Sequence, residues 1–264
     1  MIRRSQQGLL FYQFELLAGQ PGLLHAVFTR LGGSSAPPYH TLNVGQLVGD
    51  NPQHVRANHH RIFNALSITQ DAVVTAQQVH GSSVAVVSEA DRGGIMPSAD
   101  ALVTESRDTY LLMRFADCLP LLMYDPARPA VALVHCGWRG VLGGVVHCAV
   151  QALRKSFGSQ PDRISACLGP SIGPCCYAVG PEVVGRVRQV FGSQADALLP
   201  VRPSGQRHFD LPGAVRAQLV DLGLQHIDES HICTACHTEE FYSHRAEAGR
   251  TGRFAALVGL HTAP

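Results

Sequence analysis

The sequence has no long uninterrupted apolar run and no marked excess of charge of either sign. Among its 264 residues, 21 lysines and arginines stand against 20 aspartates and glutamates, which gives a formal net charge of +1 at pH 7. Proteins that bind polyanions normally carry a large basic excess, so neither nucleic acid nor an anionic membrane is an expected partner. No segment approaches the roughly 18 apolar residues that a membrane-spanning helix needs.

The N-terminal segment also lacks the features of a secretory signal. Arg3 and Arg4 precede an apolar stretch, but Gln13 and Glu15 interrupt it, and no small-residue cleavage site follows. We therefore expect a cytoplasmic protein. In a reducing compartment the eight cysteines are expected to be mostly free thiols that serve core packing, metal ligation or nucleophilic chemistry.

Long linkers, low-complexity tracts and internal repeats are absent as well, so we expect one domain over residues 1–264. The turn-rich stretches at 32–38, 91–98 and 170–174 are short enough to be surface loops. Apolar runs predict strands over 25–29, 73–77, 84–87, 101–104, 110–114, 119–124, 130–135, 164–169 and 255–260. Helical spacing predicts helices over 52–66, 141–157, 181–191 and 212–222. This order of elements favours a mixed-sheet α+β domain over a doubly wound parallel sheet.

His80 stands directly after an apolar strand and before a glycine, in the run Gln77-Gln78-Val79-His80-Gly81. A histidine at this place can project from the rim of a sheet as a metal ligand. A lone histidine is more often a hydrogen-bonded structural residue, so both interpretations stay open for this residue taken alone.

Cys118 lies between two predicted strands, in the run Phe115-Ala116-Asp117-Cys118-Leu119-Pro120. It could be a thiolate ligand, a nucleophile or a small buried hydrophobic residue. The neighbouring Asp117 carboxylate would raise the pKa of the thiol unless a metal ion or a histidine offsets it. A nucleophilic role for Cys118 therefore requires a helper group.

A glycine-flanked turn joins an apolar strand to a predicted helix in the run Val134-His135-Cys136-Gly137-Trp138-Arg139-Gly140. Trp138 is the only tryptophan of the chain. Arg139 could hold an anion or stack on an aromatic ring, and the exposed N–H groups at the start of the helix favour anions too. We expect this stretch to line a functional site.

His80, Cys118 and His135 share a position at or near the end of a predicted strand. Strand ends at one edge of a sheet can converge although they are far apart in sequence. Two imidazoles and one thiolate form a zinc ligand set that leaves the fourth position for water or substrate. Zinc would favour the Cys118 thiolate despite Asp117, while a Cys-His nucleophile pair built from the same residues remains the alternative.

Two further groups of residues have a functional and a plain interpretation. Cys233 and Cys236 have the spacing of half a structural zinc site, and Cys175 with Cys176 could supply the rest. Successive side chains of an extended segment point in opposite directions, so we expect these four to be reduced or partly buried thiols. The arginines that follow residue 244 form either a solvated basic loop or an anion site for phosphate.

In this order, these stretches resemble the laccase-domain family, also called the multicopper-polyphenol-oxidase-like family and described as purine nucleoside phosphorylases. The resemblance covers nearly the whole chain. The matching motifs are Thr29-Arg30 with Gly32-Gly33, Leu42-Asn43-Val44-Gly45, Gln78-Val79-His80-Gly81, Ala116-Asp117-Cys118-Leu119-Pro120, His135-Cys136-Gly137-Trp138-Arg139-Gly140, Gly169-Pro170-Ser171-Ile172-Gly173, Tyr177 with Val179-Gly180, Phe209-Asp210-Leu211, Cys233-Thr234 and Phe241-Tyr242-Ser243-His244-Arg245.

The resemblance implies a single-domain αββα-type sandwich with mixed β-sheets and a zinc site formed by His80, Cys118 and His135. It implies phosphorolysis of adenosine, inosine, guanosine and methylthioadenosine, with some adenosine deamination. Other descriptions of the family are copper-dependent polyphenol oxidation and the editing of peptidoglycan precursors. Two positions depart from the family pattern, because His59 stands where members often carry arginine and Ala178 where they carry glutamate. Either departure could alter substrate preference or anion binding.

The residues themselves separate these functions. Multicopper oxidation needs several coppers bound by many closely spaced histidines, whereas His59-His60 is the only adjacent pair. Phosphorolysis needs cations that hold phosphate near C1′ of the ribose. The candidate residues for substrate or phosphate binding are Arg30, Asn43, Gln78, Trp138, Arg139 and Arg245, and Asp117 is the candidate catalytic acid or base. We thus expect a metalloenzyme for purine nucleosides and phosphate, with one zinc ion or copper in its place, that is a monomer or a weak homodimer.

Overall fold

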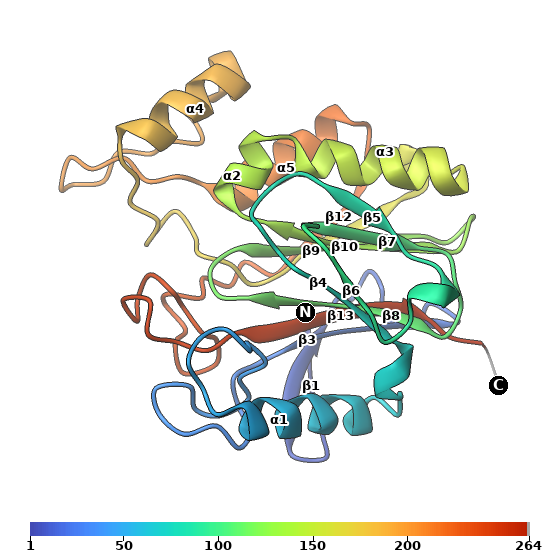
Figure 1. The fold of residues 1–264 in the computed structure, drawn as a ribbon. Helices are drawn as coiled ribbons and strands as arrows, with labels where there is room; N and C mark the ends of the chain where they lie inside the picture. Colours follow the sequence, from blue (N-terminus) through green and yellow to red (C-terminus); the bar gives the residue numbers. More distant parts are fainter. Residues whose placement is uncertain (263–264) are drawn as a thin grey trace.

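The structure, a computed structural model that describes residues 1–262, is built of two facing β-sheets with helices on both outer sides (Figure 1). The seven-stranded sheet has the order β1 (Ile2–Gln6), β2 (Leu9–Gln13), β3 (Leu23–Phe28), β13 (Phe254–Leu260), β8 (Thr109–Phe115), β4 (Val73–Ala76) and β6 (Ile95–Met96). The six-stranded sheet has the order β12 (His226–Glu229), β11 (Ser165–Leu168), β9 (Leu119–Asp125), β10 (Ala130–Cys136), β7 (Ala101–Thr104) and β5 (Val84–Val86).

Helices cover the two outer faces. They are α1 (Pro52–Ala65), α2 (Trp138–Leu142), α3 (Val145–Phe157), α4 (Pro181–Phe191) and α5 (Leu211–Asp221), with short 3₁₀ turns at Gln70–Ala72, Glu89–Asp91, Pro161–Arg163 and Gly192–Gln194. α1 packs on the seven-stranded sheet, while α3 and α5 pack on the six-stranded one (Figure 1). Within residues 1–262, no helix is both long enough and apolar enough to span a bilayer.

Both sheets are mixed, and their central strands are buried on both faces. All seven residues of β9, β10 and β13 are buried, because one face of each strand meets the other sheet and the opposite face meets helices. Most pairings are antiparallel, whereas β4 runs parallel to β6 and β8, β5 runs parallel to β7, and β11 runs parallel to β12. The predicted αββα sandwich with mixed sheets is therefore confirmed.

Several element predictions need correction. The predicted helix over 141–157 is two helices, because Gly143 and Gly144 separate α2 from α3 and Gly144 adopts φ +87°. β6 lies inside the stretch 91–98 that was expected to be a loop. Sequence patterning also misses β1, β2 and β12. Four of the five residues of β1 are exposed, so this edge strand has no apolar run to mark it.

Candidate metal centre

His80, Cys118 and His135 meet where the chain crosses between the two sheets. His80 lies in the turn after β4, Cys118 links β8 of one sheet to β9 of the other, and His135 is part of β10. One ligand atom of each residue lies within 4.8 Å of the others. The two imidazole rings are 4.8 Å apart between centroids at an interplanar angle of 74°. We call this group the His-Cys site.

Asp100, which the sequence patterning does not single out, holds two of the three ligands. Its fully buried carboxylate lies 2.8 Å from Nδ1 of His135. It also accepts the backbone N–H groups of Val79, His80 and Gly81 at 3.2, 2.9 and 2.7 Å. These bonds fix the turn in which His80 adopts a φ of +60°. The sequence feature that could have identified Asp100 is its position directly before the apolar strand β7.

The position of Asp100 selects the ring nitrogen of His135 that is free to bind a metal. Burial alone would raise the pKa of Asp100, but hydrogen bonds from His135 and from the backbone N–H groups hold it below its usual value. An ionised carboxylate only accepts hydrogen bonds, so Nδ1 of His135 donates to Asp100, and Nε2 is the nitrogen that can bind a metal ion once its own proton is lost. Carboxylate-bound histidines are common ligands at zinc sites because the bond orients the ring and raises its basicity.

The electrostatics of the site favour a negatively charged sulfur. Burial would raise the pKa of Cys118, but the charge of His135 and hydrogen bonds from His135 and His80 lower it to about 6. Burial would lower the pKa of His135, and the Cys118 thiolate and Asp100 raise it to about 9. The fold thus stabilises a negatively charged Cys118 beside a positively charged His135. A divalent metal ion bound there would stabilise the same thiolate.

The backbone of Gly137 packs directly against the residues of the His-Cys site. A Cβ atom at this position would stand 3.1 Å from Sγ of Cys118 and 3.1 Å from Cδ2 of His80. The backbone of Gly137 therefore closes against the ligands, and a larger residue would displace them. Two imidazoles and a thiolate in this arrangement fit zinc, and such a donor set also accepts copper.

The carboxylate of Asp117, the candidate acid or base, is held by three donors. It accepts the hydroxyls of Thr234 and Ser243, both at 2.7 Å, and the backbone N–H of Arg245 at 2.6 Å. Asp117 adopts a φ of +84°, just before Cys118. This geometry ties the loop that carries Cys118 to two segments from the C-terminal half of the chain.

The three candidate phosphate-binding arginines lie in different environments. Arg30 is buried, and its guanidinium donates to Glu247 at 3.0 Å and to two backbone carbonyls. Arg139 is exposed and stacks on Trp138 at 4.4 Å. Arg245 is exposed too and donates to the carbonyl of Ala178 at 2.7 Å. Within residues 1–262, neither Arg139 nor Arg245 has a carboxylate within 4.0 Å, so both guanidinium groups keep donors for an anion.

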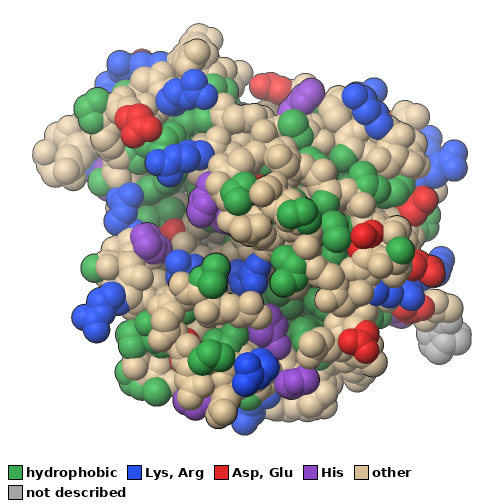
Figure 2. All heavy atoms as spheres, viewed as in Figure 1, with side chains coloured by type: hydrophobic (Ala, Val, Ile, Leu, Met, Phe, Trp, Pro, Cys, Tyr) green, Lys and Arg blue, Asp and Glu red, His purple; other side chains and the backbone are tan. Residues whose placement is uncertain are grey.

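Tyr177 lies beside the guanidinium group of Arg245. Burial raises the pKa of Tyr177, the charge of Cys118 raises it further, and the charges of Arg245 and Arg139 lower it. The ring also lies 5.1 Å from the guanidinium carbon of Arg245. Sequence reasoning does not select Tyr177 as a site residue. Figure 2 shows arginine or lysine and histidine side chains gathered around a hollow on one face of the molecule.

The side chains of Asn43 and Gln78, both candidates for substrate binding, bond to the protein itself. The amide of Gln78 bonds to both backbone groups of Arg114, at 2.9 and 3.0 Å. Asn43 is fully buried, donates to Asp50 at 2.8 Å and accepts the backbone N–H of Arg253 at 2.8 Å. These contacts position the loops around the site.

The two positions that depart from the family pattern have separate surroundings. The ring of His59 lies 3.2 Å from the carbonyl of Val44, and burial lowers its pKa to about 4. His59 is therefore neutral at physiological pH, unlike the arginine expected there. Ala178 contributes its backbone carbonyl to Arg245.

Comparisons with known proteins extend over almost the whole chain. The family model described as multi-copper polyphenol oxidoreductase laccase matches residues 24–261. Purine nucleoside phosphorylase YlmD of Geobacillus stearothermophilus is 35% identical over 249 residues, which are 90% of each protein. Purine nucleoside phosphorylase YfiH of Escherichia coli is 36% identical over 88% of this chain and 91% of its own length. The crystal structure of YlmD from Geobacillus stearothermophilus has a TM-score of 0.92 and 33% identity, and the match covers 98% of both chains.

Proposed function

Since this chain belongs to the multi-copper polyphenol oxidoreductase laccase family, we propose that it is a zinc-dependent purine nucleoside phosphorylase. The observation that carries the proposal is the His-Cys site, where three ligand atoms converge and Asp100 orients His135. Three protein ligands with an open fourth position are the arrangement of a catalytic zinc site. The names of the relatives from Geobacillus stearothermophilus and Escherichia coli supply the reaction.

The proposed substrates are phosphate and the purine nucleosides adenosine, inosine, guanosine and methylthioadenosine. In this glycosyl transfer, a phosphate oxygen bonds to C1′ of the ribose while the bond from C1′ to the purine nitrogen breaks. The products are a ribose 1-phosphate and the purine base, which takes up a proton. When bound, zinc supplies Lewis-acid polarisation of an oxygen at the open position.

The remaining steps belong to side chains around the site. Arg139 and Arg245 hold the phosphate, because both guanidinium groups are exposed and lack a carboxylate partner. Trp138 and Tyr177 offer apolar faces for the purine. Arg30 is a weaker candidate than the sequence indicates, since Glu247 already neutralises it. Asp117 as catalytic acid or base stays a prediction, while its three hydrogen bonds support a positioning role.

We include adenosine deamination in the proposal because the open position suits the activation of water as well as of phosphate. Copper-dependent polyphenol oxidation is the less favoured alternative. The His-Cys site offers one N₂S ligand set, which can take up copper but does not supply a multicopper array. The expected setting is the cytoplasm, with small molecules as partners and the chain as a monomer or weak homodimer.

A product assay tests this function directly. The zinc-loaded protein is incubated with inosine or adenosine, with and without phosphate, and the bases, ribose 1-phosphate, inosine and ammonia are measured. We expect base release that depends on phosphate. Release of ammonia from adenosine without phosphate would demonstrate deamination. Cleavage of a peptidoglycan precursor at an amide bond, without phosphate, would instead support the editing hydrolase.

Replacement of the sulfur ligand links the activity to the metal. Cys118→Ala should lose the zinc of the His-Cys site and lower kcat/KM for inosine by about a thousandfold or more. Cys148→Ser is the matched control, because Cys148 lies on α3 outside the site and should keep full activity. Undiminished phosphorolysis by metal-free Cys118→Ala would refute the assignment.

A further inference from the structure

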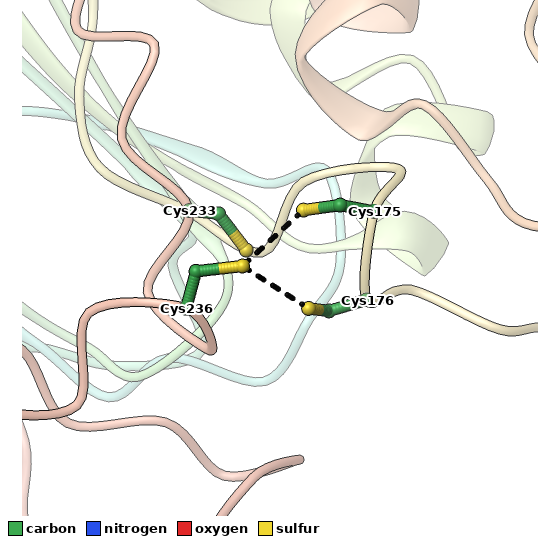
Figure 3. Close-up of side chains that lie close together, drawn as sticks. All are labelled: Cys175, Cys176, Cys233 and Cys236. Atoms are coloured by element: carbon green, nitrogen blue, oxygen red, sulfur yellow. Dashed lines mark hydrogen bonds between the residues drawn. The ribbon is translucent and has the colours of Figure 1, made fainter.

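A second group of metal-ligating side chains lies outside the His-Cys site, and the proposed function does not use it. Cys175, Cys176, Cys233 and Cys236 place their four sulfur atoms within 4.8 Å of one another. Sγ of Cys236 lies 3.6 Å from Sγ of Cys175 and 3.4 Å from Sγ of Cys176. Figure 3 shows the four side chains pointing towards a common centre. We call this group the four-cysteine cluster.

The expectation that Cys175 and Cys176 diverge is wrong, because the two residues lie in a turn and not in an extended segment. The backbone N–H of Cys176 donates to the carbonyl of Gly173 at 3.0 Å, which closes that turn. On the opposite side, the N–H of Cys236 donates to the carbonyl of Cys233 at 3.1 Å. Two tight turns thus direct four thiols to one point.

Gly173 shapes the cluster as Gly137 shapes the His-Cys site. A Cβ atom at Gly173 would stand 3.3 Å from Sγ of Cys175 and 3.4 Å from Cβ of Cys233. Without a side chain, Gly173 comes close enough for its N–H to donate to Sγ of Cys233 at 3.2 Å. A backbone N–H that points at a sulfur stabilises a thiolate.

We propose that the four-cysteine cluster binds a structural zinc ion. Tetrahedral coordination with Zn–S bonds of about 2.3 Å places neighbouring sulfurs about 3.8 Å apart. The distances of 3.4 and 3.6 Å are close to that value and far from the roughly 2.05 Å of a disulfide. Four thiolates fill every position of the ion, so this site is closed to substrate.

The surroundings of the cluster suit a negatively charged metal site that is reached from solvent. The guanidinium of Arg202 donates to the carbonyl of Pro174 at 2.8 Å, which holds a cation beside Cys175. A cavity of about 430 Å³ is lined by Gly173, Cys175 and Cys233, which gives the ion a route to the sulfurs.

The ion would join two segments that hold the loop of the His-Cys site. In the first segment, Ile172 donates its N–H to the carbonyl of Asp117 at 2.9 Å. In the second, the hydroxyl of Thr234 donates to the carboxylate of the same residue at 2.7 Å. Asp117 precedes Cys118, so a zinc ion in the four-cysteine cluster would fix the catalytic loop from outside.

Zinc content per chain tests the proposal without any assumption about the reaction. Full-length protein is loaded with zinc, passed through a desalting column and analysed for zinc, iron and copper. We expect two zinc ions in the wild type, one in Cys118→Ala and one in a Cys233→Ser, Cys236→Ser double variant. Cys148→Ser should keep both ions. A single zinc in the wild type that disappears with Cys118→Ala, or iron in place of zinc, would overturn the proposal.

Thiol labelling of the wild type gives a second measurement that does not depend on how the variants fold. Cys175 and Cys236 are exposed, so as free thiols both are accessible to a maleimide. In the zinc-loaded protein we expect both to react roughly tenfold or more slowly than after treatment with a chelator. Equal rates in the two samples contradict a zinc site.

Discussion

The His-Cys site and the four-cysteine cluster are both sulfur-containing groups, but they differ in ligand number and in the scaffold that carries them. The first has three ligands at the ends of strands in two sheets, with a buried carboxylate behind one of them. The second has four thiols on two turns outside the named strands, where Cys233 forms an isolated bridge with Ser171. Three ligands leave a metal open for chemistry, whereas four close it.

The scaffolds match the catalytic role proposed for the His-Cys site and the structural role proposed for the four-cysteine cluster. Strand ends within a packed core hold ligands within the small tolerance that catalysis requires. Turns are less rigid, and a metal ion that links them adds stability where the fold has little regular structure. A metal ion in the four-cysteine cluster would therefore compensate for the irregular segments near the His-Cys site.

The largest expected effects come from two matched glycine substitutions, one beside the His-Cys site and one beside the four-cysteine cluster. In Gly137→Ala the new Cβ would press on Cys118 and His80, so we expect kcat/KM to fall by about a hundredfold or more. In Gly173→Ala the Cβ would press on Cys175, so we expect the melting temperature to fall by about 5 °C while most activity is kept at low temperature. Activity assays and thermal unfolding measure both outcomes.

Gly180→Ala is the control for both substitutions, because a Cβ there meets no atom within 4 Å. If Gly173→Ala removed activity as completely as Gly137→Ala at every temperature, the division into a catalytic and a structural group would fail.

Asp100→Asn should weaken metal binding at the His-Cys site alone. The amide lacks the charge that orients His135, and its NH₂ group faces backbone donors, so zinc affinity should fall by about 10–100-fold. Competition with a chromophoric chelator measures the affinity. Asp210→Asn is the control, since Asp210 caps α5 through the N–H of Gly213 and should affect stability only. Unchanged zinc affinity in Asp100→Asn would show that Asp100 does not position His135 for the metal ion.

The sequence was sufficient to predict the parts of the His-Cys site that depend on local pattern. Continuous apolar runs predict β9 and β10, and Cys118 and His135 lie at their ends. Asp100 could not be assigned because its role arises from the pairing of β7 with β10, which places it beside a residue 35 positions away. A single sequence contains no direct signal of such a pairing.

Two other interpretations depended on backbone geometry that the sequence does not reveal. The adjacent Cys175 and Cys176 converge because Pro174 begins a turn, whereas an extended backbone would have separated them. Gln78 looks like a ligand-binding amide until its partner, the backbone of Arg114 on β8, is seen. In both cases the residue types are informative, while their partners come from distant or irregular segments.

Replacement of Arg139 or Arg245 should weaken the binding of phosphate near the His-Cys site. Arg139→Gln and Arg245→Gln should each raise KM for phosphate by about tenfold, with a smaller change in KM for inosine. Arg154→Gln, at the end of α3, is the control cation and should have no effect. A rise in KM for inosine alone would reassign these arginines to the nucleoside. Zinc in the four-cysteine cluster should be unaffected in all three variants.

The smallest expected effect comes from the contact that joins the two groups. Thr234→Val removes one of the three hydrogen bonds to Asp117 and keeps the shape of the side chain, so we expect a loss of about 1 kcal/mol in stability and a fewfold loss of activity. If the four-cysteine cluster acts through this contact, Thr234→Val should cost less in the Cys233→Ser, Cys236→Ser background than in the wild type. Unfolding measurements on the four proteins give this difference. Additive losses would mean that the two groups stabilise the chain independently, because residues that act through one contact are not additive.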